Sequence, residues 1–287
     1  MGDPRLIDGR KLAGEMLDQI AIEVAARKMG ALVSITIGVV PEIDVYVRNQ
    51  ERGAAKAGID FRRESWAGDI TQADAKKRIV ELNDAKDVTG IIMQRPAPAH
   101  LNVRSLQSAI HPLKDVEGMN PASIGNIVYN DVALAPCTAA AAVDLIKSTG
   151  VPLQGAEVVM IGHSEIVGKP CGLMLMAEGA TVTVCHHMTR SVAMHSRRAD
   201  ILIVAVGKAH LIGADMIKPG AVVIDIGINQ IEVDGQFKIV GDVDTDAAID
   251  IASWITPVPG GVGPVTVARL MRNALTAHQR QTTLGWV

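Results

Sequence analysis

The chain has 287 residues, of which 48% are hydrophobic, 21% charged and 2% aromatic, and its formal net charge is −3. This length suits one large or two modest domains, and the composition is typical of an ordinary globular protein. The weak net charge and the scarcity of aromatic rings argue against a nucleic-acid partner, which needs basic surfaces and stacking platforms.

Cysteine usage and hydropathy point to a reducing compartment. The three cysteines, Cys137, Cys171 and Cys185, lack CxxC spacing, so we expect neither a disulfide framework nor a zinc site. The histidines have no ligand partners at a recognisable spacing, and we expect no metal. No apolar stretch approaches the length of about 18 residues that a membrane span needs, and the N-terminus lacks a signal-peptide form. We therefore predict a cytoplasmic protein that does not enter a membrane.

The first 122 residues alternate between helical and strand patterns. Apolar residues recur at helical spacing from Leu12 to Val24, and a β-branched run follows. This pattern predicts an α/β unit without a phosphate-binding turn of its own. The expected elements are helices over residues 9–27, 44–57 and 72–83, and strands over residues 32–39 and 90–94. A further helix over residues 138–148 is expected to link this unit to a second one.

The second unit opens with a strand, a glycine turn and a helix. A β-branched run from Val158 ends at Gly162, and Gly168 begins a helical stretch. This order is how α/β domains present backbone N–H groups to a dinucleotide pyrophosphate. The spacing departs from GxGxxG, because Ser164 stands where the middle glycine would be. Short apolar runs over residues 180–184, 200–206 and 221–226 are typical of parallel strands buried on both faces. We predict a Rossmann-like nucleotide-binding domain.

A constrained apolar loop lies near the C-terminus. The stretch from Thr256 to Thr266 holds three prolines and three glycines in eleven residues, between a short strand over 254–255 and a helix over 267–277. Such a loop favours close backbone approach to a flat ligand, although a plain surface turn is the alternative. We expect the last helix to return to the first unit. The predicted domains are thus residues 1–138 plus 264–287, and residues 139–263, with a cleft between them.

Together these motifs resemble the bifunctional methylenetetrahydrofolate dehydrogenase/cyclohydrolase family, collinearly from about residue 5 to residue 278. No single motif is specific, but the set is. The matching stretches are Leu6-Ile-Asp-Gly9, Val45-Tyr46, Gly90 to Pro98, His111 to Gly118, Pro136-Cys-Thr138, Gly162 to Pro170, Ala180 to His186, Ala221 to Asn229, Gly241-Asp-Val243 and Thr256 to Thr266.

The resemblance implies two α/β domains, a folate cleft between them, a nicotinamide cofactor and a homodimer. The family oxidises 5,10-methylenetetrahydrofolate to the methenyl cation and hydrolyses that cation to 10-formyltetrahydrofolate. Carried over by position, Tyr46 would lie along the folate, Gln94 beside the reacting carbons and Glu117 at the pterin edge. The resemblance also implies that the pterin is approached by Pro259, Gly260 and Gly261, and the cofactor by Gly162, His163, Ser164, Ile166, Val167, His187 and Ile228.

The chain departs from the family at two positions. The family has a lysine four residues after the tyrosine, one helical turn on, where this chain has Gln50. It also has an aspartate where this chain has Glu117, whose carboxylate reaches one methylene further. An amide cannot supply the proton transfers that hydrolysis needs, whereas hydride transfer needs mainly alignment. We therefore expect dehydrogenase activity with weak or lost cyclohydrolase activity.

Two alternatives stay open. In the first, Lys56 or a bound water replaces the lysine and the enzyme is fully bifunctional. In the second, the chain is a non-catalytic folate- or nucleotide-binding paralogue; its intact glycine and proline loops argue against this. A generic hydroxy-acid dehydrogenase is disfavoured, because no His/Asp pair with a carboxylate-clamping arginine stands out.

Residues in two loops indicate whether the cofactor carries a 2′-phosphate or a free 2′-hydroxyl on its ribose. His163 follows Gly162 where many relatives have an arginine for the 2′-phosphate. The segment Cys185-His-His-Met-Thr-Arg190 holds no acidic residue that could bind a free 2′-hydroxyl. We predict NADP, with NAD left open.

Overall fold

The computed structural model describes residues 3–233 and 235–286, which divide into two compact units. One unit comprises the residues up to Ala13 with Thr138–Thr266, and the other Gly14–Cys137 with the segment from Val267. The first residues thus group with the nucleotide-binding unit, whereas the sequence pattern put them in the folate-binding domain. The reason is local pairing, because the backbone N–H of Ile7 donates to Ile255 O and that of Ile255 donates to Arg5 O.

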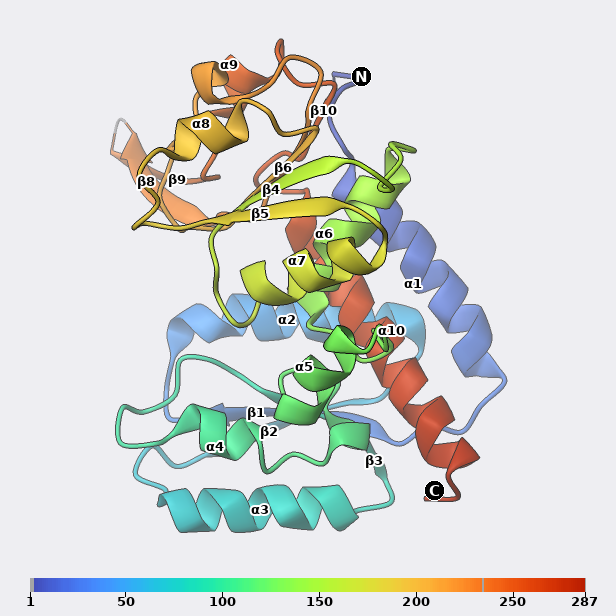
Figure 1. The fold of residues 1–287 in the computed structure, drawn as a ribbon. Coiled ribbons are helices and arrows are strands. Elements are labelled where there is room, and N and C mark those ends of the chain that lie inside the picture. Colours follow the sequence, from blue (N-terminus) through green and yellow to red (C-terminus); the bar gives the residue numbers. More distant parts are fainter. Residues whose placement is uncertain (1–2, 234, 287) are drawn as a thin grey trace. The chain divides into compact units, whose positions relative to one another are not determined.

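The unit around Gly14–Cys137 is built on a three-stranded parallel sheet in the order β2-β1-β3 (Figure 1). Its strands are β1 (Ala31–Ile37), β2 (Phe61–Trp66) and β3 (Val88–Met93). Its helical segments are most of α1 (Gly9–Ala25), α2 (Pro41–Ala57), α3 (Gln72–Asp84), α4 (Val103–Gln107), η1 (Pro112–Lys114), α5 (Pro121–Val128) and most of α10 (Val262–Thr283).

Local sequence explains where these helices begin and end. Pro41 starts α2, where its missing N–H costs nothing, and Gly58 ends it with φ of 72°. Helix α3 is capped by Thr71, whose side chain accepts from the backbone N–H of Asp74. Helix α2 therefore begins three residues earlier than predicted, because the proline marks its first turn.

The nucleotide-binding unit holds a five-stranded sheet in the order β10-β7-β6-β4-β5, paired in parallel throughout (Figure 1). Its strands are β4 (Glu157–Ile161), β5 (Thr181–Cys185), β6 (Ile201–Val204), β7 (Val222–Asp225) and β10 (Trp254–Ile255). It further contains α6 (Cys137–Ser148), α7 (Gly168–Ala177), α8 (Val192–Ser196), η2 (Ala214–Met216), α9 (Thr245–Ala248) and the hairpin β8 (Asn229–Val233) and β9 (Gln236–Val240). The predicted α/β class with a Rossmann-like domain is confirmed.

Both cores are aliphatic, as the scarcity of aromatic residues requires. The larger sheet is packed by side chains such as Val159, Leu202 and Val223, and the smaller by Val33, Ile79 and Ile91. Trp66 is the aromatic member of the second core. Among the described residues, no helix is both long and apolar enough to span a membrane.

Candidate active site

A buried amide cluster lies where β1, β3 and α2 meet. Gln94 directly follows β3, and its backbone N–H donates to Ile35 O on β1. Its side-chain Nε2 donates to Gln50 Oε1 at 2.7 Å and to Ser34 Oγ at 3.0 Å. The exposed fractions of Gln50 and Gln94 are 9% and 7%. The two predicted positions are therefore in direct contact, and both Nε2 hydrogens of Gln94 are used.

Ser34 belongs to this cluster although sequence reasoning did not select it. It is the buried one of two hydroxyl residues, Ser34 and Thr36, in the otherwise apolar run Ala31–Ile37, and it is 1% exposed. A polar residue inside a strand buried on both faces needs a partner, which is the signal that could have identified it. Here that partner is the amide of Gln94.

Tyr46 and Gln50 lie on one side of helix α2, and the basic residues of the helix lie on its other sides. Tyr46 is 52% exposed, one helical turn before the buried Gln50. Arg48 and Arg52 are exposed, and their offsets of two residues from Gln50 direct them away from it. Lys56 Nζ pairs with Asp18 Oδ1 at 2.9 Å on α1. All three side chains that form the amide cluster are uncharged.

Glu117 is tied to the same end of β3. Its Oε2 accepts from the backbone N–H of Met93 at 2.9 Å, one residue before Gln94. Burial raises the pKa of Glu117 to about 7, the negative charge of Asp115 adds to this, and the Met93 N–H and Arg95 oppose it. The carboxyl group thus titrates near neutrality, at a strand end shared with the amide cluster.

Asp115 organises the loop that carries Glu117. Its carboxylate accepts from the backbone N–H groups of Met119 and Asn120 and from the hydroxyl of Ser123. Gly118 has φ of 70°, and a Cβ there would lie 2.4 Å from the carbonyl carbon of Ala135. The motif therefore divides into a structural aspartate and a glutamate that faces the strand end.

In the other unit, two glycines shape the turn between β4 and α7. Gly162 has φ of 115°, and an added Cβ would lie 2.2 Å from Ala205 O. At Gly168 an added Cβ would lie 2.1 Å from Gly162 O. Close backbone packing explains both glycines despite their six-residue spacing. Ser164 Oγ accepts from the backbone N–H of Val167 at 3.2 Å and caps the turn.

The remaining predicted cofactor residues differ in exposure. Val167 is buried, whereas Ile166 and Ile228 keep exposed fractions of 36% and 55%. His163 and His187 are exposed and lie near each other and near His186, which sequence reasoning did not select as a site residue. No group of three or more His, Cys, Asp or Glu side chains in the described part of the chain is arranged to hold a metal ion.

Two buried aspartates hold the loops at the carboxyl ends of β6 and β7. Asp242 accepts from the backbone N–H groups of residues 206, 207 and 208 and from Asn229 Nδ2. Asp225 accepts from the backbone N–H groups of Gly227, Asp242 and Val243. Burial raises the pKa of Asp225 to about 6, although these three donors oppose the shift.

The proline–glycine loop after β10 packs against the start of α1. A Cβ added at Gly9 would lie 1.9 Å from Gly261 O, and Gly260 has φ of 116°. Pro259 follows a cis peptide bond, and Thr256 Oγ1 accepts from the backbone N–H of Asp225 at 2.7 Å. Backbone therefore approaches backbone closely in this loop, and the predicted approach of this loop to a flat ligand stays a prediction.

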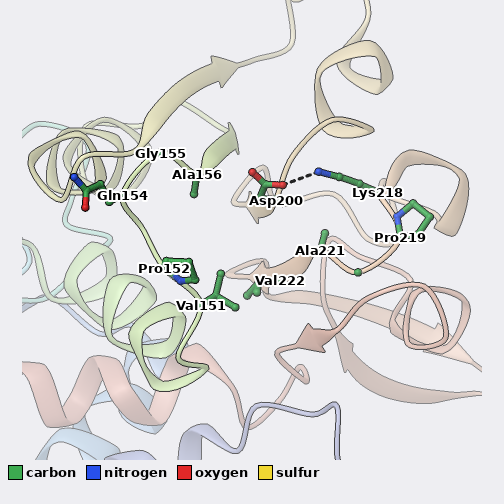
Figure 2. A pocket seen from close by; sticks show the side chains of 11 residues that line it. Val151, Pro152, Gln154, Gly155, Ala156, Asp200, Lys218, Pro219, Ala221 and Val222 are labelled. Carbon is green, nitrogen blue, oxygen red and sulfur yellow. Dashed lines mark hydrogen bonds and ion pairs between the residues drawn. The ribbon is translucent and has the colours of Figure 1, made fainter.

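A cavity of about 420 Å³ opens at the amino ends of β4, β6 and β7 in the larger sheet (Figure 2). It is lined by residues that precede β4, β6 and β7, and by the ion pair of Lys218 Nζ with Asp200 Oδ1 at 2.6 Å. Open α/β sheets bind ligands at the carboxyl ends of their strands. None of the predicted site residues lines this cavity, and we do not assign the cofactor to it.

Two models of one protein family match this chain. Residues 7–117 match the family model described as tetrahydrofolate dehydrogenase/cyclohydrolase, catalytic domain. Residues 136–282 match that of the same family's NAD(P)-binding domain.

Full-length relatives and solved structures are also similar. Bifunctional protein FolD 3 of Roseobacter denitrificans is 68% identical over 288 residues, covering 100% of this chain and 99% of that protein. Bifunctional protein FolD of Rhodobacter capsulatus is 68% identical over 290 residues, covering 99% and 97%. The methylenetetrahydrofolate dehydrogenase-cyclohydrolase of Trypanosoma brucei, solved with NADP cofactor and inhibitor, has a TM-score of 0.91 at 35% identity and covers 98% of this chain and 99% of its own. The chain therefore belongs to the tetrahydrofolate dehydrogenase/cyclohydrolase family.

Proposed function

We propose that this protein oxidises 5,10-methylenetetrahydrofolate to 5,10-methenyltetrahydrofolate with NADP and hydrolyses the product weakly or not at all. The observation that supports this is the buried contact of Gln94 Nε2 with Gln50 Oε1 at 2.7 Å. It puts an uncharged amide at the position where the family uses a lysine, one helical turn after Tyr46.

The oxidation step needs little acid–base catalysis from the protein. Bound NADP would accept the hydride, while the folate nitrogens share the charge that develops on the bridging carbon. The protein must align the two reactants and exclude competing geometries. Gln94 suits this role because two hydrogen bonds fix its amide, which leaves its Oε1 for the folate.

Hydrolysis, in contrast, needs a group that transfers protons. A water must lose a proton as it attacks, and a ring nitrogen must gain one as the ring opens. A positioned acid–base group is worth about 10²- to 10⁴-fold in such a step. Neither Gln50, Gln94 nor Ser34 titrates near neutral pH, so this cluster supplies no proton carrier.

Full bifunctionality is the second candidate, favoured by the word bifunctional in the names of relatives at 68% identity. It would need another amine, and Lys56 is the nearest along α2. Lys56 is engaged by Asp18 Oδ1 at 2.9 Å and by Gly14 O at 3.3 Å. Those partners argue against its serving the amide cluster.

The remaining folate contacts follow the family pattern. Tyr46 is proposed to lie along the folate, and its exposed ring is free to do so. Glu117 is proposed to accept from the pterin's amino and ring N–H groups, which needs the ionised carboxylate. Pro259, Gly260 and Gly261 are proposed to let backbone approach the ring systems.

The proposed NADP site is the turn after β4. A Cβ at Gly162 would overlap Ala205 O and one at Gly168 would overlap Gly162 O, so this close turn needs glycine at both positions. We propose that Gly162, His163, Ser164, Ile166, Val167, His187 and Ile228 contact the cofactor. The match to an NAD(P)-binding domain and the NADP-bound trypanosomal relative support this.

We further propose a homodimer and a cytoplasmic location. Strand β5 is an edge of the larger sheet, Val184 on it is 42% exposed, and Met176 on α7 and Met188 after β5 are also exposed. An unpaired strand edge with apolar side chains is typical of a surface that another copy covers. The free cysteines suit a reducing compartment.

Parallel assays test the proposed reaction. Purified protein with methylenetetrahydrofolate and NADP should reduce the cofactor stoichiometrically, and methenyltetrahydrofolate should accumulate. Gln50→Lys should accelerate its decay, whereas Asn49→Lys, which adds the same charge at the neighbouring exposed position, should not. Folate binding without any cofactor reduction would instead favour a non-catalytic paralogue.

A further inference from the structure

Helix α10 carries two buried amides that the proposed reaction does not use. Asn273 is 2% exposed and Gln281 is fully buried, on a helix whose other buried residues include Met271, Ala274 and Leu275. A polar side chain on a buried helix face is destabilising unless its hydrogen-bonding groups find partners. The partners of each amide therefore indicate which part of the fold it holds in place.

Asn273 acts on the residues on both sides of Glu117. Its Nδ2 donates to Val116 O at 2.8 Å and to Ala135 O at 2.9 Å. Val116 directly precedes Glu117, so the first hydrogen bond holds the peptide unit that joins these two residues. Gly118 directly follows Glu117 and packs on Ala135, because a Cβ added at Gly118 would lie 2.4 Å from the carbonyl carbon of Ala135. One buried amide thus ties together the two segments that flank this carboxyl group.

The peptide unit before Glu117 is held by further contacts. Cys137 Sγ donates to Val116 O at 3.4 Å, and this thiol stays protonated because burial raises its pKa far above the ordinary value. A Cβ added at Gly90 would lie 2.4 Å from Val116 Cγ1, so the side chain of Val116 packs closely on β3. From this fixed backbone the carboxylate of Glu117 accepts from the N–H of Met93 at the end of the same strand.

Gln281 makes equivalent contacts further from Glu117. Its Nε2 donates to Leu113 O at 2.7 Å and to Thr89 O at 2.8 Å. Leu113 lies four residues before Glu117, and Thr89 lies four residues before Met93. The two amides therefore match in chemistry, in burial and in the number of carbonyl groups they bind, and they differ in their distance along the chain from the carboxyl group.

We propose that Asn273 is a positioning residue for folate binding, because it fixes the residues on both sides of Glu117 and so sets the place from which that carboxylate meets the pterin. This inference rests on the proposed contact of Glu117 with the pterin. Hydrogen bonds weaken steeply when donor and acceptor are misaligned, so a small shift of this backbone reduces the contact. Losing one hydrogen bond to a charged group corresponds to about a tenfold change in affinity.

Initial rates of NADP reduction, together with urea denaturation, separate positioning from stability. Asn273→Ala should raise the KM for methylenetetrahydrofolate about tenfold and leave the KM for NADP within about twofold. Gln281→Ala should lower the urea midpoint by a similar amount, yet leave both KM values within about twofold. In a Glu117→Ala background, Asn273→Ala should raise the folate KM no further, because the carboxylate through which it acts is gone.

A second variant covers a failure of Asn273→Ala to fold. Asn273→Ser keeps one hydroxyl donor and part of the side-chain volume. It should raise the folate KM about threefold, again with the KM for NADP unchanged. The same comparison with Gln281→Ala then applies.

The outcomes separate this inference from the proposed function. If Glu117→Ala leaves the folate KM unchanged, the proposed contact of Glu117 with the pterin is wrong and the role of Asn273 is wrong with it. If Glu117→Ala raises this KM but the Asn273 variants affect it no more than Gln281→Ala does, the proposed contact stands and Asn273 only stabilises the fold. A further rise of the folate KM on adding Asn273→Ala to Glu117→Ala would also overturn the inference.

Discussion

Replacing Glu117 by glutamine should stabilise the free protein while weakening its hold on folate. Glu117 is half-buried, and its carboxyl group accepts from one backbone donor, the N–H of Met93 at 2.9 Å. Burial raises its pKa from 4.5 to about 7. At about 1.4 kcal/mol per pH unit, this corresponds to about 3 kcal/mol, an upper estimate for one group.

The sign follows from proton binding. Because the folded state binds this proton more tightly, the contribution to stability is fully present below about pH 4.5 and is lost as the pH rises through about 7. Glu117→Gln removes that dependence. The free energy of unfolding of the variant, relative to the unmodified protein, should therefore increase by about 2 to 3 kcal/mol from pH 5 to pH 8.

Urea denaturation across this pH range measures the difference, with Glu81→Gln on the exposed face of α3 as the matched control. Parallel pH profiles for Glu117→Gln and the unmodified protein would refute the reasoning. In the folate assay the same variant should raise KM, because an amide cannot accept from two pterin N–H groups as a carboxylate does. A variant that is more stable but binds folate less tightly is the result expected when the replaced residue serves function.

Three further changes have outcomes that the geometry fixes. Asp242→Asn should lower the free energy of unfolding by about 3 kcal/mol, because three backbone N–H groups would lose a charged acceptor. An unchanged midpoint of urea denaturation would contradict this. Gly162→Ala should lower the free energy of unfolding by at least about 2 kcal/mol, since φ is 115° and the added Cβ would lie 2.2 Å from a carbonyl oxygen. The matched control Gly155→Ala, with φ of 78° and open space around the Cβ, should lower it by only about 1 kcal/mol. Ser34→Ala should lower the dehydrogenase kcat about threefold to tenfold without changing NADP affinity, because it frees the amide of Gln94; equal loss of NADP binding would point to a structural role.

The sequence predicted the buried strands well and strands β2, β8 and β9 not at all, while β5 was predicted as a strand but its expected burial on both faces was wrong. Strands β4, β6 and β7 are apolar except for Glu157 at the start of β4 and Asp225 at the end of β7, as burial on both faces favours. Strand β2 was missed because Arg62, Arg63 and Glu64 interrupt any apolar pattern at this sheet edge. The hairpin of β8 and β9 was missed for the same reason, since β9 is exposed along most of its length.

For the candidate site as well, the sequence predicted some features and missed others. Helical spacing brought Tyr46 and Gln50 onto one face, and the family motifs supplied Gln94. The contact of Ser34 with Gln94 joins residues sixty positions apart, so no spacing rule could anticipate it. Nor does the sequence reveal that Glu117 titrates near neutrality, because that depends on the burial of its loop. Sequence thus identified residues, whereas packing determined their partners and their protonation.

The most direct test of the central claim is the rate at which the unmodified protein hydrolyses added methenyltetrahydrofolate, measured beside its dehydrogenase rate. The Gln50–Gln94 contact offers no group that titrates near neutral pH, so hydrolysis should barely exceed the rate in buffer. Gln50→Lys should then raise it by up to about 10²-fold. Hydrolysis by the unmodified protein as fast as its own dehydrogenation would contradict the account.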